Sequence, residues 1–195
     1  GGMTDSAPVR WDEDCLTLNV SAPVSISNTS GSRPVLVWIH GGGYRTGQGA
    51  IPWYNGTRFA RDQDIVVVSI NYRLGALGFA DLTHLGDEFK TSNVNGMLDQ
   101  IAALQWVQRN IEAFGGDPKR VTIAGESAGG FSVGALMGCS AAQGLFSQAI
   151  AQSGAAHHTL PPAAAQTVGQ TFCEHLGQNN AVGVMAASVE DILSA

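Results

Sequence analysis

The sequence has few positive charges. Lysine and arginine together number 10 among 195 residues, against 16 aspartates and glutamates, and the formal net charge is -6. A nucleic-acid surface needs clustered positive side chains to neutralise phosphates, so the composition excludes nucleic acid as the expected partner. A small neutral or apolar ligand fits this charge better.

Long apolar segments are also lacking. The apolar runs have the length of strands and are interrupted by polar residues, whereas a membrane-spanning helix needs about 20 consecutive apolar residues. We therefore expect no membrane span and a soluble protein, either cytoplasmic or secreted. The three cysteines, Cys15, Cys139 and Cys173, show neither metal-ligand spacing nor an even-numbered disulfide framework. We accordingly expect free thiols, no metal and no organic cofactor.

Neither end of the sequence carries a boundary signal. The first residues, Gly1-Gly2-Met3, are not a basic and apolar leader, and the helical pattern at 189–193 has no capping signal after it. We expect residues 1–195 to be the amino-terminal portion of a single domain that continues further. The oligomeric state is not indicated.

Strand and helix patterns alternate along the chain. Strands are predicted at 15–20, 35–39, 65–70, 121–124 and 149–151, and helices at 97–114 and 128–137. The runs at 35–39, 65–70 and 121–124 are continuously apolar, which is typical of strands buried on both faces. The alternation predicts an α/β fold whose largely parallel sheet has helices on both faces. In such sheets, chemistry gathers at the carboxyl ends of the strands.

Gly125-Glu126-Ser127-Ala128-Gly129 lies where a predicted strand meets a predicted helix. The pattern Gly-X-Ser-X-Gly in this context is the nucleophile elbow, in which glycines permit a tight turn and the serine hydroxyl projects into the site. The pattern also arises by chance in glycine-rich chains. The strand before it and the helix after it favour the interpretation that Ser127 is a nucleophile.

His40-Gly41-Gly42-Gly43 follows the predicted strand at 35–39. Consecutive glycines at a strand end let backbone N–H groups point at an oxygen, as in an oxyanion hole for acyl transfer. A plain loop or a phosphate cradle are the alternatives. Phosphate binding is disfavoured because no Lys-Ser or Lys-Thr pair follows the glycines.

The chain resembles the type-B carboxylesterase family, which has the α/β-hydrolase fold. The resemblance rests on motifs in family order, namely Glu13-Asp14-Cys15-Leu16, Trp38-Ile39-His40-Gly41-Gly42-Gly43-Tyr44, Asn71-Tyr72-Arg73-Leu74-Gly75, Asp99-Gln100, Phe114-Gly115-Gly116-Asp117-Pro118, the elbow, and Gln152-Ser153-Gly154. It implies that Ser127 is the nucleophile and that the backbone N–H groups of Gly42, Gly43 and Ala128 form the oxyanion hole. It also implies that Glu126 helps to order water and the catalytic histidine.

The same resemblance places the acid and the histidine of the catalytic triad well downstream of the elbow, in the order Ser, acid, His. We therefore expect both beyond residue 195. His157 and His158 are the nearest histidines after the elbow, but they precede Pro161-Pro162 and a solvated loop is favoured there. Cys15 matches a cysteine that many family members bridge to an upstream partner, which this sequence lacks.

The predicted function is hydrolysis of a small-molecule carboxylic ester through an acyl-enzyme on Ser127. The isolated 195 residues are expected to be inactive, since they supply no general base for Ser127. Two alternatives remain open. The chain is a non-catalytic fragment, or it belongs to a cholinesterase-like protein that acts in binding or adhesion.

Overall fold

The computed structural model describes residues 12–24 and 32–195. The chain divides into two compact units. The first comprises residues 1–72 and 99–158, and the second comprises residues 73–98 and 159–195. Each unit is described by itself.

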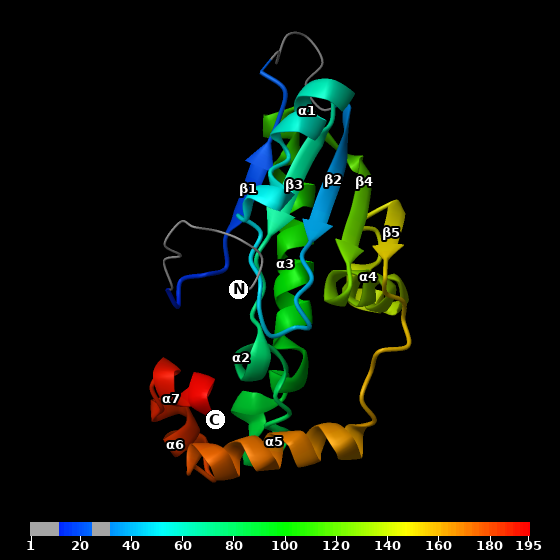
Figure 1. The fold of residues 1–195 in the computed structure, drawn as a ribbon. Helices are drawn as coiled ribbons and strands as arrows, with labels where there is room; N and C mark the ends of the chain where they lie inside the picture. The colour runs from blue at the N-terminus through cyan, green and yellow to red at the C-terminus, as the bar shows by residue number, and fades with distance from the viewer. Residues whose placement is uncertain (1–11, 25–31) are drawn as a thin grey trace. The chain divides into compact units, whose positions relative to one another are not determined.

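The first unit is built on a five-stranded sheet with the strand order β1-β3-β2-β4-β5 (Figure 1). The strands are β1 (Leu18–Ser21), β2 (Arg33–Ile39), β3 (Val66–Ile70), β4 (Gly116–Glu126) and β5 (Gln148–Gln152). β1 pairs antiparallel with β3, and the other neighbours are parallel. The register sets Val37 beside both Val68 and Ile123. The predicted strands are confirmed, and so is the largely parallel sheet.

Helices cover both faces of this sheet, as expected for the α/β-hydrolase fold. They are α1 (Thr57–Gln63), α3 (Asn95–Asn110), which begins in the second unit, and α4 (Ala128–Gly138), with short 3-10 helices η1 (Pro52–Tyr54), η5 (Ile111–Phe114) and η6 (Ser140–Ala142). Ile111 packs near Val35 on one face, where Leu104 and Val107 of α3 are fully buried. On the other face, Gly56 at the start of α1 lies against Val67.

The strand β2 is buried on one face and half-open on the other. Val35, Val37 and Ile39 are buried, whereas Leu36 and Trp38 are half-buried. The expectation that this strand is buried on both faces was therefore wrong. The reason is that, among the described residues, α1 packs chiefly against β3.

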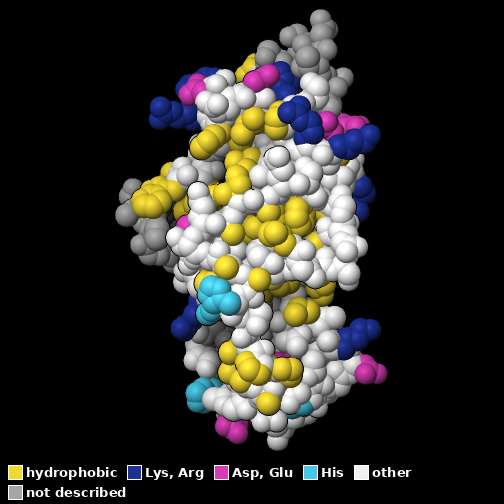
Figure 2. Space-filling view, turned by 90° about the vertical axis from the view of Figure 1, so that its right-hand side faces the viewer, with side chains coloured by type: hydrophobic (Ala, Val, Ile, Leu, Met, Phe, Trp, Pro, Cys, Tyr) yellow, Lys and Arg dark blue, Asp and Glu magenta, His cyan; other side chains and the backbone are white. Residues whose placement is uncertain are grey.

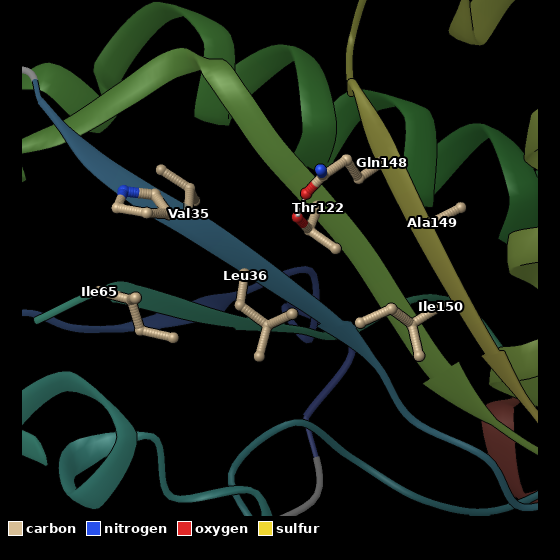
Figure 3. Close-up of a pocket in the computed structure, with 8 residues that line it drawn as sticks. Val35, Leu36, Ile65, Thr122, Gln148, Ala149 and Ile150 are labelled. Atoms are coloured by element: carbon tan, nitrogen blue, oxygen red, sulfur yellow. Dashed lines mark hydrogen bonds between the residues drawn. The ribbon is translucent and has the colours of Figure 1, made fainter. Parts of the chain in front are cut away.

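A hollow of about 500 Å³ lies over this open face. Leu36, Ile65 and Ile150 project into it, and its polar side chains, Thr122 and Gln148, bond each other at 3.1 Å (Figure 3). None of the described residues that line this hollow has an ionisable side chain.

The strand β5 forms the edge of the sheet and is largely exposed. Figure 2 shows hydrophobic side chains at the surface on this side of the molecule. Ile150 leaves 47% of its surface accessible. The strand predicted at 149–151 therefore forms, but its outer edge has no partner among the described residues.

The strand β4 begins earlier than predicted. Gly115 adopts a left-handed conformation with φ 82° and ends η5, and the extended backbone starts at Gly116 instead of Val121. Gly116 pairs with Arg33 of β2, and the register shifts between Arg33 and Val35. Gly116 and Val121 of β4 pair with Arg33 and Val35 of β2, which are only two residues apart, so residues 117–120 bulge out of the regular pairing.

The second unit is helical. It contains α2 (Gly75–Phe79), η2 (Thr83–Leu85), η3 (Asp87–Phe89), η4 (Ser92–Val94), α5 (Pro162–Leu176), α6 (Ala181–Ala186) and α7 (Val189–Ser194). Its buried core consists of Ala80, Leu82, Cys173 and Val184. Across the described residues, no helix is both long enough and apolar enough to cross a membrane.

Candidate active site

Ser127 occupies the turn between β4 and α4, and its backbone has an unusual conformation. Its φ of 54° and ψ of -120° lie outside the regions that residues with a Cβ normally adopt. Two hydrogen bonds hold the turn. The Ser127 N–H donates to the carbonyl of Gln152 at 2.9 Å, and the Phe131 N–H donates to the carbonyl of Ser127 at 2.9 Å. A strained serine fixed between strand and helix is the local geometry of a nucleophile elbow.

The elbow requires glycine because three backbones meet there. A Cβ on Gly125 would lie 2.5 Å from the carbonyl oxygen of Gly129, and a Cβ on Gly129 would overlap the carbonyl oxygen of Ile39. Ile39 is the last residue of β2 and pairs with Gly125. The end of β2 therefore lies in backbone contact with the first turn of α4.

The glycine loop begins directly after β2. Gly42, Gly43 and Tyr44 have φ values of 111°, 62° and 59°. The N–H groups of Arg45 and Thr46 both donate to the carbonyl of Gly42 at 3.1 Å, which closes a tight turn. Within residues 12–24 and 32–195, the N–H groups of Gly42 and Gly43 donate to no backbone carbonyl.

The loop lies against the elbow. A Cβ on Gly41 would lie 3.3 Å from Cβ of Ser127 and 3.0 Å from Oε2 of Glu126. Ala128 is the first residue of α4, where a backbone N–H has no partner within the helix. The structure thus places the start of the glycine loop, Glu126, Ser127 and Ala128 in one cluster.

Glu126 also influences the side chain of Tyr54 in η1. Burial raises the pKa of the Tyr54 hydroxyl, and the negative charge of Glu126 raises it further. Tyr54 packs on Trp38 with ring centroids 5.4 Å apart. The Glu126 carboxylate therefore lies near the aromatic side chains of Tyr54 and Trp38.

His40 contacts the start of the glycine loop. Its ring is buried and stacks on Tyr72 at 4.5 Å, and its Nδ1 lies 2.8 Å from the carbonyl oxygen of Gly41. The Tyr72 hydroxyl donates to the carbonyl of His40 at 2.7 Å. No role for Tyr72 is predicted from the sequence, although it stands two residues after β3, whose carboxyl end neighbours that of β2.

The two nearest histidines after the elbow contact α4 instead of bonding to Ser127. His157 and His158 are exposed, as expected, and their rings contact Phe131 with centroid distances of 5.4 Å and 4.5 Å. No hydrogen bond joins Ser127 to a histidine in the described part of the chain. All three cysteines carry free thiols.

Burial of His40 makes stability depend on pH. Burial lowers the pKa of His40 below its ordinary value of 6.5, so the unfolded chain binds a proton more readily than the folded one. The contribution of neutral His40 to the free energy of unfolding is fully present above pH 6.5 and is lost as the pH falls below it. The slope is at most about 1.4 kcal/mol per pH unit.

We expect His40→Gln to remove this dependence of the free energy of unfolding on pH between pH 6.5 and 5, as measured by urea unfolding of the complete protein. The control is His84→Gln, because His84 is exposed. An unchanged pH dependence in His40→Gln would show that another group titrates in this window.

Comparison with known proteins identifies the family. The sequence model of the carboxylesterase family matches residues 2–192. The chain belongs to the carboxylesterase family. It is 45% identical over 188 residues to the para-nitrobenzyl esterase of Bacillus subtilis, covering 95% of this chain and 37% of that one. It is 49% identical over 173 residues to a phenmedipham hydrolase of Pseudarthrobacter oxydans, covering 87% and 33%.

Solved structures of this family have the same fold. A para-nitrobenzyl esterase structure matches 97% of this chain with a TM-score of 0.88 and 44% identity. A carboxylesterase of Geobacillus stearothermophilus matches 91% with a TM-score of 0.85 and 41% identity. These matches cover 40% and 39% of the two solved chains. The chain therefore spans about two fifths of the length of its carboxylesterase relatives.

Proposed function

We propose that the complete protein is a serine carboxylic-ester hydrolase that acts on small-molecule esters. One observation carries the proposal. Ser127, held at φ 54° and ψ -120° between β4 and α4, lies beside a glycine loop in which the N–H groups of Gly42 and Gly43 donate to no backbone carbonyl of the described residues. This arrangement suits acyl transfer, in which a nucleophile and an oxyanion hole must face the same carbonyl group.

In the first step, Oγ of Ser127 attacks the carbonyl carbon of the ester, and its proton passes to a general base. The carbonyl oxygen becomes an oxyanion, which accepts hydrogen bonds from the N–H groups of Gly42, Gly43 and Ala128. Collapse of this intermediate expels the alcohol, which takes the proton from the base and leaves an acyl group on Ser127.

In the second step, water attacks the acyl-enzyme and releases the carboxylic acid, and Ser127 regains its proton. We assign the base to a histidine beyond residue 195, as the family order implies. Glu126 of the elbow, whose Oε2 lies beside Gly41, would orient the attacking water and this histidine.

The relatives' names cover a para-nitrobenzyl esterase and a phenmedipham hydrolase. These names support hydrolysis of small molecules by the complete protein. They differ in substrate, so we propose the ester class and no particular acyl or alcohol group.

Covalent labelling separates a hydrolase from a binding protein. We expect a fluorophosphonate to label the complete protein once per chain, with the added mass on the peptide that contains Ser127. The reason is that only an activated serine displaces the fluoride at neutral pH. Heat-denatured protein is the control and should remain unlabelled. Absence of labelling, together with tight binding of an intact ester, would instead favour the binding or adhesion alternative.

A further inference from the structure

A chain of two hydrogen bonds, one buried and one part-buried, connects two helices to the glycine loop. Nε2 of Gln100 in α3 donates to Oγ of Ser132 in α4 at 3.1 Å, and Oγ of Ser132 donates to the hydroxyl of Tyr44 at 3.3 Å. Gln100 and Ser132 are completely inaccessible to solvent. All three residues belong to the first unit.

These hydrogen-bonded polar side chains are unfavourable for stability in their apolar surroundings. Leu104 on α3 and Val133 and Leu136 on α4 are buried and apolar, so apolar residues would fill the space well. Oε1 of Gln100 is buried without a hydrogen-bond partner within the described residues. A buried amide that satisfies only part of its hydrogen-bonding capacity destabilises the fold. The polar chain is therefore poorly explained by stability alone.

The position of Tyr44 suggests what these hydrogen bonds do. Tyr44 directly follows Gly43, and its φ of 59° is unfavourable for a residue with a Cβ. An external contact must hold such a conformation. Burial raises the pKa of Tyr44, so its hydroxyl keeps its proton at neutral pH.

Ser132 lies on the same helix as the elbow. The helix α4 begins at Ala128, directly after Ser127, and Ser132 follows on its second turn. The bond from Ser132 to Tyr44 therefore ties the glycine loop to the helix that carries one proposed oxyanion donor and adjoins the nucleophile. Oxyanion stabilisation is sensitive to displacements of a few tenths of an ångström, so this tie fixes a distance that matters.

We propose that Tyr44 is a positioning residue for the oxyanion hole, acting through its hydrogen bond to Ser132 and, behind it, Gln100. The inference rests on the proposed function. Tyr44 touches no reacting atom in this role. Its hydroxyl sets the position of the Gly42 and Gly43 N–H groups relative to Ser127.

The test uses Tyr44→Phe, Ser132→Ala and the double variant in the complete protein. Tyr44→Phe keeps the ring and removes only the hydroxyl. We expect each single variant to lower kcat for p-nitrophenyl butyrate about 10-fold, because only donor geometry is disturbed, and to leave KM within about twofold. The double variant should be no worse than the poorer single variant, because both substitutions break the same bond.

A second readout distinguishes positioning from general loosening of the fold. Binding of a trifluoromethyl ketone, which forms a tetrahedral adduct with serine, should weaken about 10-fold in Tyr44→Phe, in parallel with kcat. The midpoint of thermal unfolding should stay close to that of the unchanged protein. Ser140→Ala, an exposed site just after α4, is the matched control and should change neither quantity.

Three results would overturn the inference. They are an unchanged kcat in Tyr44→Phe, multiplicative losses in the double variant, and a loss of kcat without weaker ketone binding. If the unchanged protein neither hydrolyses esters nor reacts with fluorophosphonate, the proposed function fails and the inference fails with it. An active protein with a fully active Tyr44→Phe variant refutes the positioning role alone.

Discussion

Replacing Ser127 with alanine is expected to lower kcat for ester hydrolysis by roughly 10⁵-fold in the complete protein. Without Oγ no acyl-enzyme forms, and only the oxyanion hole and substrate binding remain to assist direct attack by water. Folding should be almost unchanged, because alanine retains the Cβ and the two hydrogen bonds of the elbow use the backbone of residue 127.

The measurement is the steady-state hydrolysis of p-nitrophenyl butyrate with freshly purified protein, together with fluorophosphonate labelling. Ser140→Ala serves as the control, since Ser140 is exposed in η6 and its substitution removes the same atom far from the elbow in sequence. Turnover by Ser127→Ala within tenfold of the unchanged protein would refute the assignment of the nucleophile.

Replacing Gly129 with alanine is expected to destabilise the complete protein by about 3 kcal/mol or more. The added Cβ would overlap the carbonyl oxygen of Ile39, which is backbone and cannot rotate away. Relief requires α4 to separate from the end of β2, and this movement would carry Ala128 and Ser127 away from the glycine loop. Activity should therefore fall together with stability.

Gly138→Ala is the matched control, because Gly138 lies in the same helix. A Cβ on Gly138 meets no atom within 4 Å. This change should be neutral or stabilise the protein by up to about 1 kcal/mol, since alanine favours the helix. The measurement is the free energy of unfolding of both variants in urea. Equal stabilities for the two variants would mean that the close approach of β2 and α4 is absent in solution.

These two predictions concern features that short stretches of sequence already indicate. The strand before Gly125, the elbow and the helix after Ser127 follow one another within a few residues. Their geometry depends on neighbouring backbone conformations, which glycine positions and apolar periodicity report directly. The α/β-hydrolase fold and the carboxylesterase family could therefore be predicted from the sequence, and both are confirmed. The roles of Ser127, Gly42, Gly43, Ala128 and Glu126 stay predictions.

Burial and strand ends could not be predicted equally well. Leu36 and Trp38 belong to a continuously apolar run, yet they are half-buried because no pattern within β2 reports how far α1 extends over the sheet. The early start of β4 at Gly116 depends on its pairing with Arg33. Both features depend on residues far away in the chain.

The sequence by itself determined the order of strands and helices, the elbow at Ser127 and the glycine loop, because each follows from the conformational preferences of adjacent residues. Only the tertiary structure decided that Gly41 lies against Glu126 and Ser127, that Tyr72 supports His40, and that Gln100 and Ser132 reach Tyr44. The parallel pairing of β2 with β4 and the packing of α4 bring these distant residues together. Such contacts join residues that are distant in sequence and share no periodicity, so no local pattern predicts them.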